Sequence, residues 1–305
     1  MNISNVSPKV LEKMQKKVQD LIAETGSVTD AAEQLSVNKG TISFVSNGDF
    51  ANVGEKTFNS LKQKLNMGSH EWGNYAVRNL SLAVTMAMAT KEKQHMAGLV
   101  AYTGAGKTHS LSLLSRKEKN VFYVLADTEM TKIYFLKAIC KALGMGRYEA
   151  FTKAEMINQI VRQLSEAEQP LLIIDDAGKL SDVNMRMFQI IYDRTEFRSG
   201  ILLAGMPYLK DSIERKATKD VRGFKELKRR IAYWEELKPI SEADVTVVCE
   251  AQEISDEGAI KYLFRECKDF GTLRNMIGNV QKLSAKSGEA ITNELLVKMN
   301  KGKIR

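Results

Sequence analysis

The sequence has few cysteines and histidines and no long apolar run. These absences argue against several classes of protein. Its only cysteines, Cys140, Cys249 and Cys267, are widely separated and lack metal-ligand spacing. They argue against a disulfide scaffold or a zinc site and predict buried thiols in a reducing cytoplasm. No run of about 18 apolar residues occurs, so we expect no membrane span. Residues 1–5 lack a basic stretch followed by an apolar one, so we expect no secretory signal.

What the chain does contain is enough apolar sequence for a sizeable core, and an excess of positive charge. Hydrophobic residues make up 44% of the 305 positions and charged residues 27%. These values are ordinary for a globular protein with one α/β core and one or two small helical domains. The net charge of +8 favours a polyanionic partner.

The positive charge is concentrated in residues 215–230, where eight basic residues face only two acidic ones. We interpret this segment as a surface that contacts the phosphates of double-stranded DNA. The candidate DNA contacts are Lys216, Lys219, Arg222 and Lys225. The alternative is an ordinary solvated face.

Residues 101–108, with the sequence Ala-Tyr-Thr-Gly-Ala-Gly-Lys-Thr, predict a phosphate-binding loop. They follow an apolar run, 96–100, that predicts a buried parallel strand, and they precede a helical pattern. Lys107 would reach the β- and γ-phosphates of ATP, and the Thr108 hydroxyl would bind Mg²⁺. The loop departs from the P-loop pattern at its first position, where Ala101 replaces glycine. The predicted nucleotide contacts are Thr103, Gly104, Ala105, Gly106, Lys107, Thr108 and His109.

A second chemical motif, residues 171–176, predicts a strand buried on both faces that ends in two acids. It resembles a Walker B element, in which Asp175 would hold Mg²⁺ and Asp176 would orient the attacking water. Asp176 is one methylene shorter than the glutamate common at that place. Met206 follows the next predicted strand, where relatives have a hydrogen-bonding residue. Both departures predict slow ATP hydrolysis, with ATP used as an assembly switch.

Three arginines are candidates for contacts to the γ-phosphate. Arg229 and Arg230 precede a predicted strand, where an arginine of an oligomeric ATPase reaches the neighbouring subunit's nucleotide. The alternative is that both bind DNA phosphates. Arg274 lies in Gly-Thr-Leu-Arg, at the predicted start of a lid helix, and is placed like a sensor arginine.

The N-terminal residues show helix-turn-helix spacing. A helix over 7–24 is followed by a short helix capped by Thr29, a turn over 36–38, and a second short helix over 39–45. The residues expected to face the major groove are Asn38, Lys39, Thr41 and Ser43. Ser36 stands where such turns usually have glycine. The alternative is a small helical bundle that binds only protein.

Helix-turn-helix, P-loop, Walker B and Gly-Thr-Leu-Arg follow one another in an order that resembles the AAA+ transposition regulators and target-selection ATPases of the phage Mu B type. Local similarity covers 120–122, 142–145, 173–175 and 230–232. The resemblance implies an α/β fold: a P-loop AAA+ core with a parallel sheet and flanking helices, an N-terminal helix-turn-helix domain and an all-helical C-terminal lid. We expect these three domains at residues 1–67, 68–239 and 240–305.

The same resemblance implies a function. Such proteins assemble with ATP as a homo-oligomeric helical filament or ring on double-stranded DNA. They deliver this target DNA to a transposase and stimulate it, in the bacterial cytoplasm or in a host cytoplasm if the gene is phage-borne. The alternative is a DNA-binding ATPase that acts as a regulator or as a replication helicase-loader.

Overall fold

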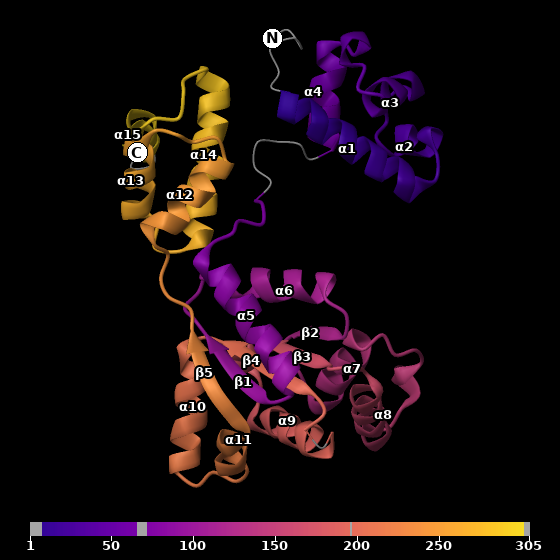
Figure 1. Ribbon diagram of the computed structural model, residues 1–305, viewed down its shortest axis with the longest axis vertical. Helices are drawn as coiled ribbons and strands as arrows, with labels where there is room; N and C mark the ends of the chain where they lie inside the picture. Colours follow the sequence, from indigo (N-terminus) through magenta and orange to yellow (C-terminus); the bar gives the residue numbers. More distant parts are fainter. Residues whose placement is uncertain (1–7, 66–71, 196, 302–305) are drawn as a thin grey trace. The chain divides into compact units, whose positions relative to one another are not determined.

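The computed structural model of the protein describes residues 8–65, 72–195 and 197–301 (Figure 1). The described chain divides into two compact units. One lies within Met1–Gly73 together with Ile277–Ala290, and the other within Asn74–Met276 together with Ile291–Arg305. The predicted domain boundaries at 67/68 and 239/240 stay predictions.

A five-stranded parallel sheet forms the centre of the second unit, with the strand order β2-β3-β4-β1-β5. Its strands are β1 (Met96–Val100), β2 (Val121–Leu125), β3 (Leu171–Asp175), β4 (Gly200–Gly205) and β5 (Ile231–Glu236). The three inner strands, β1, β3 and β4, are buried at every residue. Their continuous apolar runs are what a parallel sheet covered on both faces requires.

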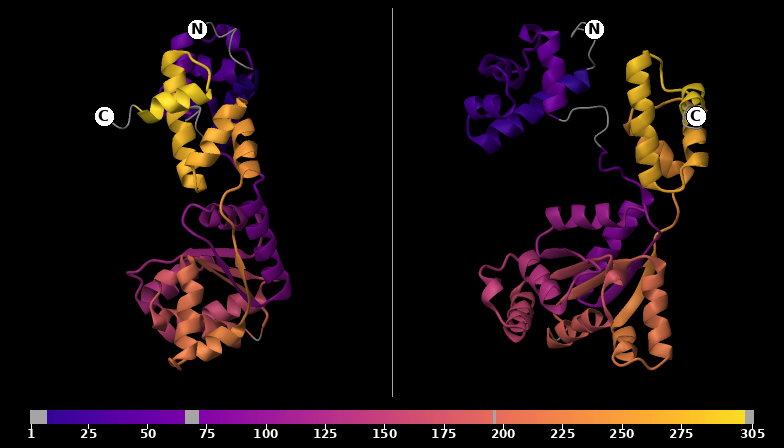
Figure 2. Two further views of the ribbon diagram at one scale, coloured as in Figure 1. Left: turned by 90° about the vertical axis from the view of Figure 1, so that its left-hand side faces the viewer. Right: turned by 180° about the vertical axis from the view of Figure 1, so that it is seen from behind.

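Helices cover both faces of the sheet, as the two rotated views also show (Figure 2). Apolar side chains of β3 alternate between the faces: Ile173 packs with α5 and α6, whereas Ile174 packs with the helices of the other face. The first face carries α5 (Arg78–Lys93) and α6 (Lys107–Lys117). The second carries α7 (Lys132–Ala142), α8 (Lys153–Glu166), α9 (Asp182–Arg194), α10 (Pro207–Thr218) and α11 (Phe224–Arg230). Short 3₁₀ turns η3 (Tyr148–Ala150) and η4 (Ala177–Lys179) connect elements of this layer.

The C-terminal residues are helical, as predicted. They form α12 (Glu242–Ala251), α13 (Glu257–Glu266), α14 (Phe270–Ser287) and α15 (Asn293–Lys301). Ser241 caps α12 with a reciprocal bond to Asp244. Helix α13 is capped by Asp256, whose side chain accepts from the Ala259 backbone N–H. Asp256 also accepts a hydrogen bond from the Asn293 backbone N–H at 3.1 Å, which ties the starts of α13 and α15 together.

The N-terminal helices surround their own apolar core. They are α1 (Pro8–Thr25), α2 (Val28–Gln34), α3 (Lys39–Ser46), η2 (Phe50–Asn52) and α4 (Glu55–Lys64). The core includes Met14, Val18, Ala31, Ile42, Val45 and Leu61. The expectation that Thr29 caps α2 is wrong: Ser27 is the cap, and its hydroxyl accepts from the Asp30 backbone N–H at 3.0 Å. Ser36 has a φ of +45°, the left-handed conformation that glycine adopts with less strain.

All three cysteines are free and buried, as expected. Within residues 8–65, 72–195 and 197–301, no helix combines the length and apolar character needed to cross a bilayer.

Candidate nucleotide-binding site

The loop between β1 and α6 has the backbone of a phosphate cradle. Gly104 and Gly106 have φ angles of +77° and +94°, which favour glycine at both positions. Gly106 is the residue from which α6 begins, so the N-terminus of that helix points at the loop. The Ala101 side chain is fully buried, and its N–H donates to the Gly205 carbonyl at 3.0 Å. Position 101 therefore continues the strand pairing, which explains why alanine is accommodated there.

Lys107 is buried at the start of α6. Its ammonium donates to the carbonyl oxygens of Ala101 at 2.6 Å and Tyr102 at 3.3 Å. Burial lowers the pKa of Lys107, whereas the nearby charges of Asp175 and Asp176 act in the opposite direction. The lysine is thus held at the loop beside both acids.

The other predicted loop contacts lie at its surface. Thr108 and His109 are exposed on the first turn of α6, and Ala105 is half-buried. Thr103 is exposed, and its hydroxyl donates to the Met206 sulfur at 3.8 Å. Met206 begins α10 after β4, so β4 places it next to the phosphate loop. A thioether is a weak acceptor.

The two acids that end β3 are held differently. Asp175 is fully buried, and one carboxylate oxygen accepts the Asp176 backbone N–H at 2.9 Å. Its other oxygen accepts the Tyr123 hydroxyl at 2.8 Å. Asp176 is half-buried, has a φ of +54°, and forms a 2.7 Å ion pair with Lys179. The predicted water-orienting acid therefore already has a cationic partner in its own loop.

Sequence reasoning missed Tyr123, but a signal for it exists. Tyr123 is the only hydroxyl-bearing residue of β2 and pairs in register with Ile173 of β3. Side chains on adjacent paired positions share a face, and Asp175 lies two residues beyond Ile173 on that same face. A long tyrosine side chain at this register can therefore reach the carboxylate.

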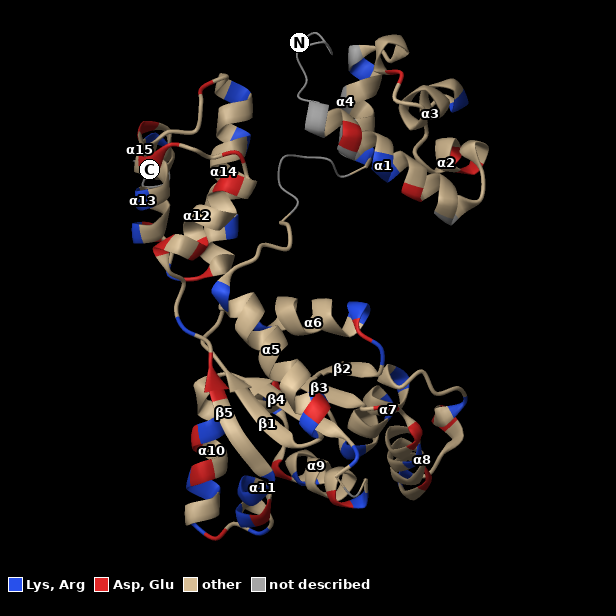
Figure 3. Cartoon of the chain, viewed as in Figure 1, with Lys and Arg blue, Asp and Glu red and all other residues tan. Residues whose placement is uncertain are grey.

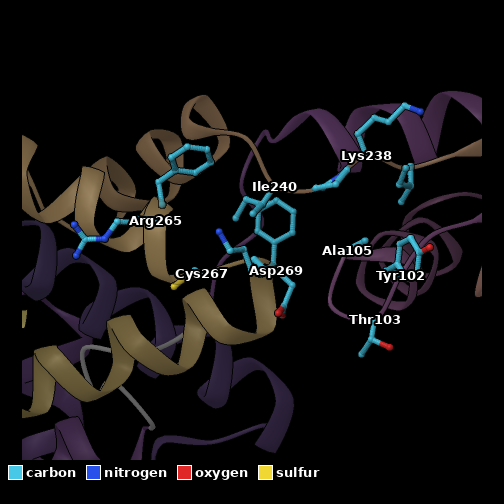
Figure 4. A pocket seen from close by; sticks show the side chains of 13 residues that line it. Tyr102, Thr103, Ala105, Lys238, Ile240, Arg265, Cys267 and Asp269 are labelled. Carbon is cyan, nitrogen blue, oxygen red and sulfur yellow. The ribbon is translucent and has the colours of Figure 1, made fainter. Parts of the chain in front are cut away.

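A pocket of about 830 Å³ opens beside the loop (Figure 4). This volume is typical of small-molecule and cofactor sites. Tyr102, Thr103 and Ala105 line it from the loop side, and Lys238, Ile240, Arg265, Cys267 and Asp269 from the connection and the C-terminal helices. Mainly apolar walls beside a phosphate cradle suit a nucleoside whose phosphates lie on the loop.

The segment before α14 contacts the phosphate loop directly. The Phe270 backbone N–H donates to the Gly104 carbonyl at 3.0 Å. A Cβ atom at Gly104 would lie 2.2 Å from a carboxylate oxygen of Asp269, so a side chain at position 104 would collide with it. The same Asp269 caps α14 by accepting the Thr272 N–H at 2.9 Å. The C-terminal helices are therefore coupled to the loop through Asp269 and Phe270.

The beginning of α5 joins the loop to the connection that leads to α12. The Asn79 side-chain amide donates to the Ala105 carbonyl at 3.2 Å and to the Lys238 carbonyl at 2.9 Å. The Arg78 backbone N–H donates to Asp244 at 2.9 Å. The two Asn79 bonds hold Ala105 and Lys238, which both line the pocket, next to each other.

The donor set fits ATP with Mg²⁺. The glycine-rich turn supplies backbone N–H groups for phosphate oxygens, and Lys107 supplies a cation. Thr108 and Asp175 offer the hard oxygen ligands that Mg²⁺ prefers, and they would hold it. When bound, Mg²⁺ would neutralise charge on the β- and γ-phosphates.

The three candidate arginines have different surroundings. Arg230 forms a two-pronged ion pair with Asp193, at 2.6 and 3.1 Å, and its side chain is only 20% exposed. Arg229, one residue earlier, is exposed at the end of α11. Arg274 is exposed on α14 and does not line the pocket. Arg229 is therefore the freer of the two residues predicted to act on a neighbouring subunit.

The basic segment maps to α10, α11 and their connection (Figure 3). Two of the four predicted DNA contacts have acidic partners: Lys216 pairs with Asp182, and Lys225 pairs with Asp220 at 2.8 Å. Lys219 and Arg222 are exposed, with no acidic partner among the described residues.

The predicted groove-facing residues lie at and on α3. The Asn38 side chain accepts the Gly40 backbone N–H at 2.8 Å, so it caps α3. Lys39 is exposed, whereas Thr41 and Ser43 are half-buried. Phe44 is exposed on the same helix, although the sequence pattern suggested no surface role for it.

Comparison with known proteins identifies the domain around this site. A family profile described as "AAA domain" matches residues 90–213. No protein of curated function matches the sequence.

Two solved structures illustrate the likeness of fold. The ORC2 protein of Aeropyrum pernix, solved as ADPNP–ADP complexes, has a TM-score of 0.56 and 11% identity, over 76% of this chain and 70% of that one. Cdc6p from Pyrobaculum aerophilum has a TM-score of 0.50 and 14% identity, over 71% of this chain and 64% of that one. At these identities the likeness is one of fold.

Four features indicate the same fold: the strand order, the loop after β1, the acids at the end of β3 and the matched profile. The fold is that of an AAA+ P-loop ATPase with a helical C-terminal region, and the enzyme class is ATPase.

Proposed function

We propose that this AAA+ ATPase binds double-stranded DNA when it carries ATP, and assembles on it as a homo-oligomeric filament or ring. The observation that carries the proposal is the coupling of the C-terminal helices to the phosphate loop through Phe270 and Gly104. A nucleotide on that loop meets the lid segment, so its binding can set the lid's position. The position of the lid, in turn, controls the contacts between subunits.

The DNA-binding part of the proposal rests on exposed cations. Besides Lys219 and Arg222 in the connection between α10 and α11, the exposed basic residues of these helices are Arg215, Lys225, Lys228 and Arg229. Clustered cations bind the DNA backbone by releasing its counterions, without reading sequence. Helices α2 and α3 form a second candidate DNA contact, with Lys39 and Phe44 on the exposed side.

ATP serves as an assembly switch in this proposal, and hydrolysis by the free protein is slow. Asp176 is short and paired with Lys179, and Met206 offers only a thioether. Activity rises when a neighbouring subunit supplies an arginine, because a guanidinium stabilises charge on the transferred phosphoryl group.

The partner we propose is a transposase, to which the assembled protein delivers target DNA and which it stimulates. This part rests on the resemblance of the motif order to the phage Mu B type. The cytoplasm is the proposed location, because all three thiols are free. A second candidate is a replication helicase-loader or DNA-binding regulator, favoured by the likeness of fold to ORC2 and Cdc6p.

Electron microscopy of the protein with ATP and long duplex DNA tests the proposal. We expect continuous coating of any duplex with ATP and none without it, together with steeply salt-dependent binding. Lys107→Ala should abolish ATP binding and tight DNA binding, whereas Lys117→Ala, an exposed change at the end of α6, should preserve both.

Two outcomes would contradict the proposal. DNA affinity of Lys107→Ala equal to wild type, without nucleotide, would break the coupling between ATP and DNA. Preference for one operator by about 10³ or more would favour the regulator, since non-specific coating shows no such ratio.

A further inference from the structure

A hydroxyl group from the edge strand β2 is bonded to the acid predicted to hold Mg²⁺. The Tyr123 hydroxyl donates to Asp175 at 2.8 Å, and the Asp176 backbone N–H donates to the other oxygen of the same carboxylate at 2.9 Å. Both oxygens of a fully buried carboxylate thus have one fixed donor each.

The ring and the hydroxyl of Tyr123 have separable tasks. The half-buried ring packs against the apolar cluster between the sheet and helices α5 and α6. Phenylalanine would serve that contact equally well. Among the residues that the structure describes, the hydroxyl hydrogen-bonds to Asp175 alone. A carboxylate has about four acceptor sites, so the two bonds leave about two for a metal and its waters.

We propose that Tyr123 is a positioning residue for Mg²⁺: its hydroxyl fixes the orientation of the Asp175 carboxylate toward the metal. The inference rests on the proposed nucleotide site and assigns it an outer-shell residue. A hydrogen bond that orients a metal ligand reduces the freedom the ligand loses on binding. Removing such partners from other metal sites typically costs 10–100-fold in metal affinity or activity.

The test is Tyr123→Phe, which removes only the hydroxyl. Binding of a fluorescent ATP analogue is measured first with EDTA and then during a Mg²⁺ titration. We expect the affinity without Mg²⁺ to match wild type and the Mg²⁺ midpoint to rise about 10-fold or more. A thermal melt of each variant verifies that the fold is retained.

Two further variants separate positioning from general packing. Tyr233→Phe removes a hydroxyl from β5 next to the same apolar cluster, and it should leave the Mg²⁺ midpoint unchanged. In an Asp175→Asn background, Tyr123→Phe should have no further effect on the midpoint, because its action passes through that carboxylate.

The outcomes are distinct. An unchanged or lower Mg²⁺ midpoint in Tyr123→Phe, with nucleotide binding intact, overturns the positioning role alone. The positioning role is also overturned if Tyr123→Phe shifts the Mg²⁺ midpoint as much in the Asp175→Asn background as in the wild-type protein. Absence of nucleotide binding by the wild-type protein overturns the proposed nucleotide site, and with it this inference.

Discussion

The nucleotide-binding edge of the sheet and the basic helices α10 and α11 hold their charged groups in opposite ways. At the sheet edge, Lys107 and Asp175 are buried and each has two hydrogen-bond partners. On α10, α11 and their connection, Lys219, Arg222 and Arg229 are exposed, while neighbouring cations are paired with acids. At the sheet edge, hydrogen bonds hold individual charged atoms in fixed positions. On α10, α11 and their connection, several exposed cations together produce a positive surface potential.

This difference sets how a substitution should act. A buried charge with defined partners has one geometry, so removing it eliminates a specific step. An exposed cation contributes to a summed potential, so removing it changes a binding curve gradually. The paired cations Lys216, Lys225 and Arg230 are a third class, because their charge is already balanced locally.

The largest expected effect comes from Arg229, the exposed arginine at the end of α11. Arg229→Ala should lower DNA-stimulated ATP hydrolysis about 10³-fold, the lower range for loss of an arginine supplied in trans. Adding Lys107→Ala subunits should restore partial activity, because they can donate Arg229 to intact neighbouring sites. Steady-state ATPase assays on co-assembled mixtures measure this.

Arg230→Ala is the matched comparison. It breaks the ion pair with Asp193, which costs stability of about 1 kcal/mol or less for a partly exposed pair. Its ATPase rate should stay close to wild type. If Arg230→Ala is the inactive variant and mixing rescues it, the assignment between the two arginines is reversed. Mixtures of Arg229→Ala and Lys107→Ala that stay inactive although co-assembled would argue against action in trans.

A smaller effect separates free from paired cations on α10 and α11. Replacing both Lys219 and Arg222 with alanine should reduce the slope of log K for DNA against log salt by about 1.8, which is 0.9 per lost phosphate contact. Replacing both Lys216 and Lys225 should change the slope less, because Asp182 and Asp220 already pair with them. Fluorescence anisotropy with duplex DNA gives both slopes. Equal slopes in the two double variants would show that local pairing does not decide which cations contact DNA.

The smallest effect concerns the carboxylate beside the phosphate loop. Asp269→Asn removes a negative charge next to Gly104 while keeping a residue able to cap α14. We expect ATP to bind about threefold more tightly, since like charges near a solvated surface cost roughly 1 kcal/mol or less. Glu266→Gln, on an exposed residue of the same segment, is the control. Weaker ATP binding by Asp269→Asn, measured by calorimetry, would mean that the carboxylate helps to form the pocket.

The sequence predicted the parts of the site whose meaning is local. Gly104, Gly106 and Lys107 identify a phosphate loop because loop geometry and helix start are written within eight residues. The buried run before Asp175 identifies a strand with acids at its carboxyl end for the same reason. Both elements occur where they were expected.

What the sequence could not predict depends on contacts between distant segments. The Tyr123–Asp175 bond needs the register of β2 against β3, and the Arg230–Asp193 pair needs α11 beside α9. The contact of Asp269 with Gly104 joins residues from two distant parts of the sequence. The cap of α2 is Ser27 and not the predicted Thr29, because neighbouring serine, threonine and aspartate compete for the same role.

The rate at which a reagent labels the buried cysteines measures how often the structure around each of them opens. Burial raises the pKa of Cys140 to about 11, and those of Cys249 and Cys267 to about 12, so thiolate is rare at neutral pH. A pulse of thiol reagent therefore modifies each site only during its exposure. The labelling rate of Cys140 on α7 reports openings of the sheet core. The labelling rates of Cys249 and Cys267 report openings of the C-terminal helices. Labelling rates with and without nucleotide compare the two kinds of opening without any engineered probe.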